Sequence, residues 1–254
     1  MTSALDEQGA EPRDEWTRVR RKGRRPMKSS GPVNPSRSNA LTPGLKQRLS
    51  FLSASDIEKE HHRITDQWRA STCRSRLQEI VKSRPCTSHI TLAICFGLGS
   101  FDPEDGSWES KRRAHVQLAA FLDIVEHLQH NNPQPIRCLF QEPIFNAADE
   151  VFIRNLGYEV VPSPGGFEQV NAATLVFGIH LYRDVYAQAI AHSLPAAFIG
   201  TPREVWEECH SSDLPDWIRL KDLDERCDKV KFPEDPGYNT FSSTTIHWGR
   251  QDDM

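Results

Sequence analysis

The chain has 254 residues, of which 37% are hydrophobic and 26% charged, and its formal net charge is −4. This length suits one medium domain with a tail, or two small domains. The composition excludes a collagen, a coiled coil, a wholly disordered chain and a disulfide scaffold. No apolar run approaches about 18 residues, and the N-terminal stretch has no apolar core, so we expect neither a membrane span nor a secretory signal.

Charge is distributed unevenly along the chain. Residues 1–48 carry 11 basic and 5 acidic side chains, and the remainder carries 20 and 30. Nucleic-acid-binding domains are usually basic, so association with nucleic acid or chromatin is a candidate role for the N-terminal segment alone.

The cysteines indicate the redox compartment. They lie far apart without a C-x-x-C pair, which predicts free thiols in a reducing compartment and no metal site. We therefore expect the protein in the cytoplasm, the nucleus or both. The six cysteines are Cys73, Cys86, Cys95, Cys138, Cys209 and Cys227.

Residues 1–50 are rich in Arg, Pro, Ser, Gly and Asn and poor in apolar residues. Such a segment cannot bury enough surface to offset the entropy of ordering, so it is predicted to be a disordered basic tail. It contains a basic run that is typical either of a nuclear-import or RNA-contacting patch or of a solvated tail. The run consists of Arg18, Arg20, Arg21, Lys22, Arg24 and Arg25.

Residues 55–83 show helical periodicity. Ser55, followed three residues later by Glu58, is a capping-box signature, so the helix is predicted to begin there. The adjacent His61 and His62 cannot both face one metal ion from a helix, and we expect both on the solvated surface.

The following segments alternate between apolar strands and amphipathic helices. Strands are predicted at 90–96, 136–140, 158–161, 174–179 and 196–199, with helices at 110–130, 146–156 and 181–193. This pattern predicts a parallel sheet with helices on both faces. The fold class is therefore α/β: a Rossmann-like three-layer domain over residues 51–254, with its core at about 88–202. A helix at 202–210, a polar stretch and an edge strand at 244–248 complete the expectation.

In open α/β sheets, ligands bind beyond the carboxyl ends of the strands, where the strand order reverses. All five predicted strands end in segments that suit a ligand, because glycine allows close approach of the backbone and a helix N-terminus offers N–H donors. Ordinary turns have the same composition, so the whole set, rather than any one turn, favours a small-molecule pocket. The ligand-binding candidates are Gly97, Gly99, Ser100, Glu142, Gly165, Gly166, His180, Gly200 and Thr201.

Individual roles follow from the side chains. Gly97 and Gly99 begin a dinucleotide fingerprint, but Asp102 stands where its third glycine would be, so no cofactor is assigned. Glu142 can accept hydrogen bonds from a ribose. His180 is a candidate general base, axial metal ligand or hydrogen-bonded cap. Acyl and phosphoryl transfer have no motif, and no catalytic residue is assigned.

A geometric expectation links two distant segments. If the strands follow the common order 3-2-1-4-5, His180 and residues 97–101 share one crevice. Gly97 and Gly99 are then expected to have positive φ angles at its edge.

Several short segments together resemble one family. They are W-T-x-V at residues 16–19, CFGLGSF at 95–101, QLA at 117–119, Leu156-Gly157 and TLVF at 174–177 leading to His180. In this combination and order the chain resembles the sensitivity-to-red-light-reduced (SRR-like) family. Departures occur at the strand ends, where the family usually has Asp-Pro in place of Glu142-Pro143 and Met-Pro-His-Cys around His180.

The resemblance implies an intracellular regulatory protein, of the kind associated with light signalling and the circadian clock or with haem metabolism. It supplies no reaction. The expected partners are proteins or a small molecule, without a membrane, and nucleic acid only through the tail. An enzyme acting on a nucleotide-type or methyl-donor ligand in the same pocket is the alternative function, and nucleic-acid or chromatin association is a third.

Overall fold

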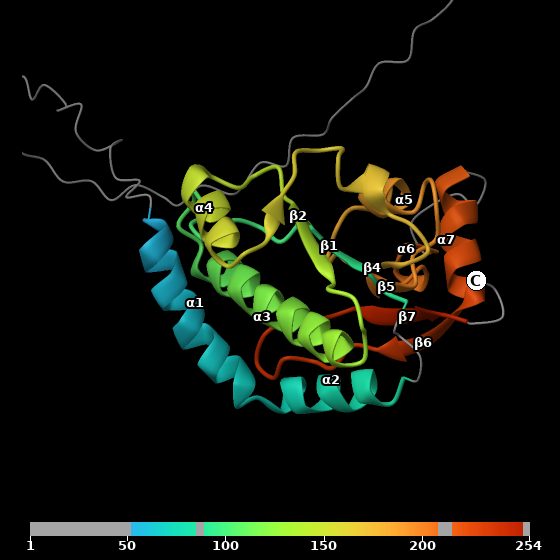
Figure 1. Cartoon of the computed structure of the whole chain (residues 1–254), viewed down its shortest axis with the longest axis horizontal. Helices are drawn as coiled ribbons and strands as arrows, with labels where there is room; N and C mark the ends of the chain where they lie inside the picture. Colours follow the sequence, from blue (N-terminus) through green and yellow to red (C-terminus); the bar gives the residue numbers. More distant parts are fainter. Residues whose placement is uncertain (1–51, 85–88, 208–214, 251–254) are drawn as a thin grey trace, which may run out of the picture. The chain divides into compact units, whose positions relative to one another are not determined.

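The computed structural model describes residues 52–84, 89–207 and 215–250 (Figure 1). Within them, one seven-stranded sheet has the order β3-β2-β1-β4-β5-β7-β6. The first five strands in the chain pair in parallel, and β7 pairs antiparallel with β5 and β6. The strands are β1 (Leu92–Phe96), β2 (Arg137–Gln141), β3 (Glu159–Val160), β4 (Thr174–Phe177), β5 (Ala197–Gly200), β6 (Cys227–Lys231) and β7 (Thr245–Gly249).

Helices cover both faces of this sheet. The helices α1 to α4 pack with one buried cluster, while η1, α5 and α7 contribute to a second cluster. In Figure 1, α1 and α2 lie along α3. The helices are α1 (Ala54–Arg69), α2 (Thr72–Lys82), α3 (Trp108–His130), α4 (Ala147–Asn155), η1 (Phe167–Gln169), α5 (Arg183–Ala189), α6 (Glu204–Glu207) and α7 (Pro215–Arg226).

The central strands are buried on both sides. Every residue of β1, β4 and β5 is buried, which explains their unbroken apolar sequences. Cys95 on β1 and Cys138 on β2 have free, buried thiols, and burial raises the pKa of Cys138 to about 12. The predicted α/β class and mainly parallel sheet are therefore confirmed. No helix in the described segments combines the length and the apolar character required to cross a bilayer.

The N-terminal helical region differs from its prediction in three ways. It forms two helices rather than one, because the chain turns at Ala70 and Ser71, and Ser71 caps the second helix. The first helix is capped by Ser53 rather than Ser55. His61 was expected on the surface but is buried, because the apolar stripe of α1 extends across it and the helix packs on α3 and α4.

The C-terminal segment also requires a correction. The strand expected at 244–248 is β7, but it lies inside the sheet, between β5 and β6, rather than at an edge. The edge strand is β6, which the sequence pattern did not predict because lysine and aspartate side chains dominate it. Charged residues are a common means of protecting an exposed strand edge. The helix α7 was likewise missed. The predicted tail over residues 1–50 lies outside the described residues.

The strand order reverses between β1 and β4. From β1 the chain proceeds to β2 and β3 on one side of the sheet, and β4 then pairs with the other side of β1 and leads to β5. The predicted order 3-2-1-4-5 is confirmed. This reversal creates a crevice beyond the carboxyl ends of β1 and β4.

Candidate functional site

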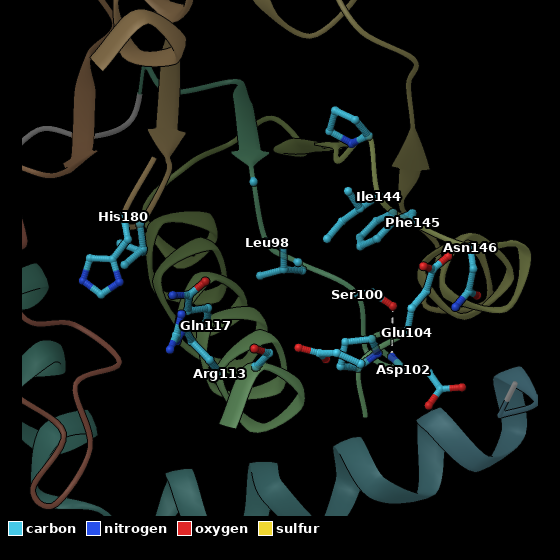
Figure 2. Close-up of a pocket in the computed structure, with 17 residues that line it drawn as sticks. Leu98, Ser100, Asp102, Glu104, Arg113, Gln117, Ile144, Phe145, Asn146 and His180 are labelled. Atoms are coloured by element: carbon cyan, nitrogen blue, oxygen red, sulfur yellow. Dashed lines mark hydrogen bonds between the residues drawn. The ribbon is translucent and has the colours of Figure 1, made fainter. Parts of the chain in front are cut away.

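A cavity of about 750 Å³ occupies this position (Figure 2). Its size is within the range of small-molecule sites. The turn after β1, the turn after β4, the loop between β2 and α4, and the first half of α3 enclose it. The lining residues are Gly97, Leu98, Gly99, Ser100, Asp102, Pro103, Glu104, Asp105, Ser110, Arg113, Gln117, Pro143, Ile144, Phe145, Asn146, Ile179 and His180.

Three residues beside the cavity have left-handed backbones. Gly97 has a φ of 63°, Gly99 of 83° and His180 of 56°. The positive φ angles expected for the two glycines are confirmed. A Cβ atom on Gly97 would lie 2.0 Å from Leu181 Cδ2, whereas one on Gly99 would enter open space. His180 lacks glycine's freedom, and such a conformation in a non-glycine residue is often found at a functional site.

Glu142 holds two loops together beside the cavity without lining it. Its Oε2 accepts a hydrogen bond from the Gly99 amide at 2.8 Å, and its Oε1 accepts one from the Ile144 amide at 3.1 Å. Both carboxylate oxygens thus fix the backbone of the wall. The ribose contact predicted for Glu142 would have to compete with these bonds.

Asp149 of α4 fixes the same wall from inside the core. Its Oδ2 accepts hydrogen bonds from Ser100 Oγ at 2.7 Å and from the Asn146 amide, and its Oδ1 accepts one from the Phe101 amide. The carboxyl is buried, and desolvation raises its pKa above the usual range even though Ser100 donates to it. Ser100 therefore contributes its hydroxyl to the scaffold of the cavity.

Two polar side chains of α3 form one wall. In Figure 2, Arg113 and Gln117 project from this helix on the side of His180, and Ile144, Phe145 and Asn146 lie opposite. Gln117 is buried, and its Nε2 is 3.4 Å from the Thr240 carbonyl oxygen. Because that oxygen can only accept, the Gln117 amide is oriented with its own oxygen away from Thr240.

The ring of His180 is held by the loop before β7. Its Nε2 lies 2.7 Å from the Ser242 carbonyl oxygen, so Nε2 carries the proton and donates it. In the neutral ring Nδ1 is then a bare acceptor. The next residue in that loop, Ser243, also has a positive φ, of 50°.

The remaining candidates lie elsewhere. Gly166 packs against Phe96, and its amide donates to Gln141 Oε1 at 2.7 Å. The Thr201 amide donates to the Tyr186 hydroxyl. The residues that do not line the cavity are Glu142, Gly165, Gly166, Gly200 and Thr201, whereas Gly97, Gly99, Ser100 and His180 line it together, as the shared-crevice expectation requires.

Sequence reasoning missed the α3 wall and the acidic loop before it. Arg113 and Gln117 are four residues apart, which places them on one helical face. Gln117 also interrupts a run of buried residues, from Ala114 to Phe121, that is otherwise almost wholly apolar. An amide in such a run is a signal that was available. In the described segments, no group of three or more His, Cys, Asp or Glu side chains is arranged to hold a metal ion.

Comparisons with known proteins give one family and several distant structures, including the following two. The cofactor-bound protein Rv0187 from MTB is 12% identical with a TM-score of 0.38, covering 81% of this chain and 94% of its own. Protein 1320 of Thermoplasma acidophilum is 12% identical with a TM-score of 0.31, covering 64% and 76%. These scores carry no argument about function. The search of curated proteins gave no match.

The family model matches most of the described domain. The SRR1 domain aligns with residues 73–248, from α2 to β7, and so includes every residue that lines the cavity. The match covers more than half of the chain and spans the motifs at residues 95–101 and 117–119. The chain therefore belongs to the SRR1 domain family.

Proposed function

We propose that this chain is an intracellular regulatory protein that binds a small molecule in the cavity beyond β1 and β4. The observation that carries the proposal is the shared crevice. The ends of β1 and β4, about 80 residues apart in sequence, meet there and border a cavity of about 750 Å³. In open α/β sheets this reversal point is the usual ligand site. Light signalling, the circadian clock and haem metabolism are the kinds of process that the family resemblance implies.

The construction of the walls supports a ligand site. Glu142 and Asp149 use their carboxylates to fix the loops that carry Gly99 and Ser100. A buried charge is costly unless hydrogen bonds compensate it, and the buried Asp149 carboxylate accepts such bonds from residues of the cavity wall. Rigid walls around an open cavity favour binding, because little ordering is required of the protein when a ligand enters.

A ligand that controls partner binding also needs a path from the cavity to the surface. Trp108 and Tyr238 are exposed, and their ring centroids are 6.0 Å apart. Trp108 begins α3, the helix that carries Arg113 and Gln117. A ligand that shifts α3 would therefore also shift this aromatic surface.

An enzyme acting in the same cavity is the second candidate function. It is favoured by His180, whose Nε2–H bond to Ser242 leaves Nδ1 free to accept a proton. Turnover of the bound molecule would establish this function, whereas a molecule recovered unchanged supports regulation.

Native mass spectrometry of freshly purified protein tests the proposal. We expect a bound small molecule in the wild type and its loss in Gly99→Leu, which adds a bulky side chain to a residue that lines the cavity. Gly106→Leu is the matched control, because Gly106 also has a positive φ and open space but does not line the cavity. Equal retention by both variants would place the molecule elsewhere, and an empty wild type would contradict the proposal.

A further inference from the structure

We propose that the cavity selects a compact organic cation that donates hydrogen bonds, such as a primary amine with an apolar body, over a phosphorylated or carboxylate ligand. This inference rests on the proposed function and names the chemical class of its ligand. It is carried by the charges of the lining residues, by the amide oxygen of Gln117, to which no described residue donates, and by the way the backbone donors at the cavity are used.

The lining is acidic. Asp102, Glu104 and Asp105 contribute three carboxylates, and Arg113 contributes one guanidinium. None of these four groups makes an ion pair in the described parts of the chain, so the lining keeps a net charge of −2. A concave surface of one sign concentrates ligands of the opposite charge.

Two further acceptors lack a donor. Gln117 is 2% exposed, and its Nε2 is directed to the Thr240 carbonyl, so its Oε1 receives no hydrogen bond from the described residues. His180 donates through Nε2 to Ser242, which leaves Nδ1 of the neutral ring as an acceptor. The Gln117 oxygen keeps accessible surface at the cavity, so a ligand N–H can reach it and donate to it.

Several of the backbone donors that a phosphate would use at the glycine turn already have acceptors within the protein. The Gly99 amide donates to Glu142. The Phe101 amide donates to Asp149, and the Asp102 amide donates to Ser100 Oγ. The first turn of α3 is capped, because the Ser110 amide donates to Ser107 Oγ. Phosphate sites use free N–H groups at such a glycine turn and helix N-terminus. Here one exposed guanidinium remains beside three carboxylates.

The opposite wall accommodates the body of the ligand. Ile144 is 64% exposed and lies beside Phe145, across the cavity from α3. An apolar or aromatic group would cover this surface while its ammonium group faces the acidic side. Asn146 uses its oxygen to cap α4, so its amide nitrogen and Arg113 remain as donors for a carbonyl or hydroxyl group.

Isothermal titration of the full chain with matched probes tests the selection. The probes are 2-phenylethylamine and 3-phenylpropanoate, which share an aromatic body and differ in charge, together with adenosine and adenosine 5′-monophosphate. We expect the amine to bind at least roughly tenfold more tightly than the carboxylate, and adenosine more tightly than its monophosphate. Added salt should weaken amine binding.

Three variants connect the effect to the cavity. The double variant Glu104→Gln, Asp105→Asn should weaken amine binding about two- to fivefold, in the range of exposed charge pairs. Gln117→Met keeps the side-chain volume but removes the acceptor oxygen, and it should weaken amine binding more than the double variant does. Glu168→Gln is the control, because Glu168 is an exposed carboxylate that does not line the cavity, and it should leave the affinity unchanged.

The outcomes separate this inference from the proposed function. The inference would be overturned if 3-phenylpropanoate bound at least as tightly as 2-phenylethylamine, or adenosine 5′-monophosphate at least as tightly as adenosine. If Gly99→Leu abolished that binding, the ligand site would remain in place. Amine binding that persists in Gly99→Leu and in the acidic double variant would place the amine outside the cavity and overturn the inference. Binding of no probe, together with an empty native mass spectrum, would overturn both.

Discussion

Two histidines, His61 and His115, are buried side by side in the core. Their Nδ1 atoms are 3.4 Å apart, and the rings stack behind Phe101, the residue after Ser100 in the cavity wall. Desolvation, followed by the charge of His62, lowers the pKa of His61 to about 4. Desolvation, followed by the charge of His61, lowers the pKa of His115 to about 3. Both rings are therefore neutral in the folded protein at neutral pH.

Replacing His115 with leucine should make stability less dependent on pH. The folded pKa lies below the unfolded value of about 6.5, so the unfolded chain takes up protons first and stability falls as the pH drops from 6.5 toward 4. Between pH 7.5 and 5 the wild type should lose unfolding free energy, and we expect His115→Leu to lose about 2 kcal/mol less, measured by urea unfolding. His62→Gln, on the exposed neighbour, is the control; an unchanged slope in His115→Leu would refute the account.

Gly97 and Gly99, which both have positive φ angles, should differ in how well they tolerate substitution by alanine. Gly99→Ala should cost about 1 kcal/mol of unfolding free energy, from backbone conformation alone. Gly97→Ala should cost more, because its Cβ would also lie 2.0 Å from Leu181 Cδ2. Chemical denaturation measures both, and adding Leu181→Ala should narrow the difference. Equal costs, with no effect of Leu181→Ala, would show that the clash is absent.

At the scale of elements, the α4 capping box anchors the cavity wall. Asn146 Oδ1 accepts hydrogen bonds from the Ala148 and Asp149 amides. The Asp149 carboxylate in turn accepts hydrogen bonds from the Ser100 hydroxyl and the Phe101 amide, in the turn after β1. The helix itself was predictable at 146–156 from its local pattern. Its link to Ser100 was not, because the partners are 49 residues apart and no local signal connects them.

Asp149→Asn should loosen this wall selectively. An asparagine has one acceptor oxygen where the carboxylate uses two, so a buried donor loses its partner at a cost of about 1–3 kcal/mol. We expect faster amide hydrogen exchange at residues 97–103 and 143–149, while β4 and β5 remain protected. Asp184→Asn, on the short helix α5, is the control. Faster exchange spread evenly over the whole sheet would contradict an anchoring role.

Element prediction succeeded where the local pattern is unambiguous. The central strands β1, β4 and β5 are largely apolar because both of their faces are buried, and the strand order follows from the common switch-point topology. The prediction failed at α1 and α2, where the two-residue turn at Ala70 and Ser71 leaves the helical periodicity nearly intact. It also failed at β6, whose lysines reflect an edge position that only tertiary structure defines.

At the scale of the whole molecule, the candidate cavity depends on two predictable strand ends and two unpredictable walls. Gly97, Gly99 and His180 were identified because glycine and histidine at strand ends have recognisable chemistry. Arg113 and Gln117 were not, because their place depends on how α3 is rotated against the sheet. That rotation is determined by packing of its buried face, in which Phe121 contacts Phe140 and Phe177.

The N-terminal segment should be dispensable for folding. It has sparse apolar residues and no strand or helix periodicity, so we expect removal of residues 1–48 to change the Tm by no more than a few degrees. The shorter chain keeps Leu52, whose amide donates to Asp102 at the cavity. Calorimetry of the two lengths measures the change, and a large fall in Tm would show that the segment stabilises the domain.

Amide chemical-shift mapping on the full chain tests the ligand site most directly. The molecule recovered from the native protein would be titrated back into isotope-labelled protein. We predict that the largest shifts occur at Gly97, Gly99, Gln117 and His180, which are far apart in sequence and share one cavity. Shifts concentrated instead at Gly165 and Gly166, or in the separate polar groove around Arg74 and Asp123, would contradict a ligand site beyond β1 and β4.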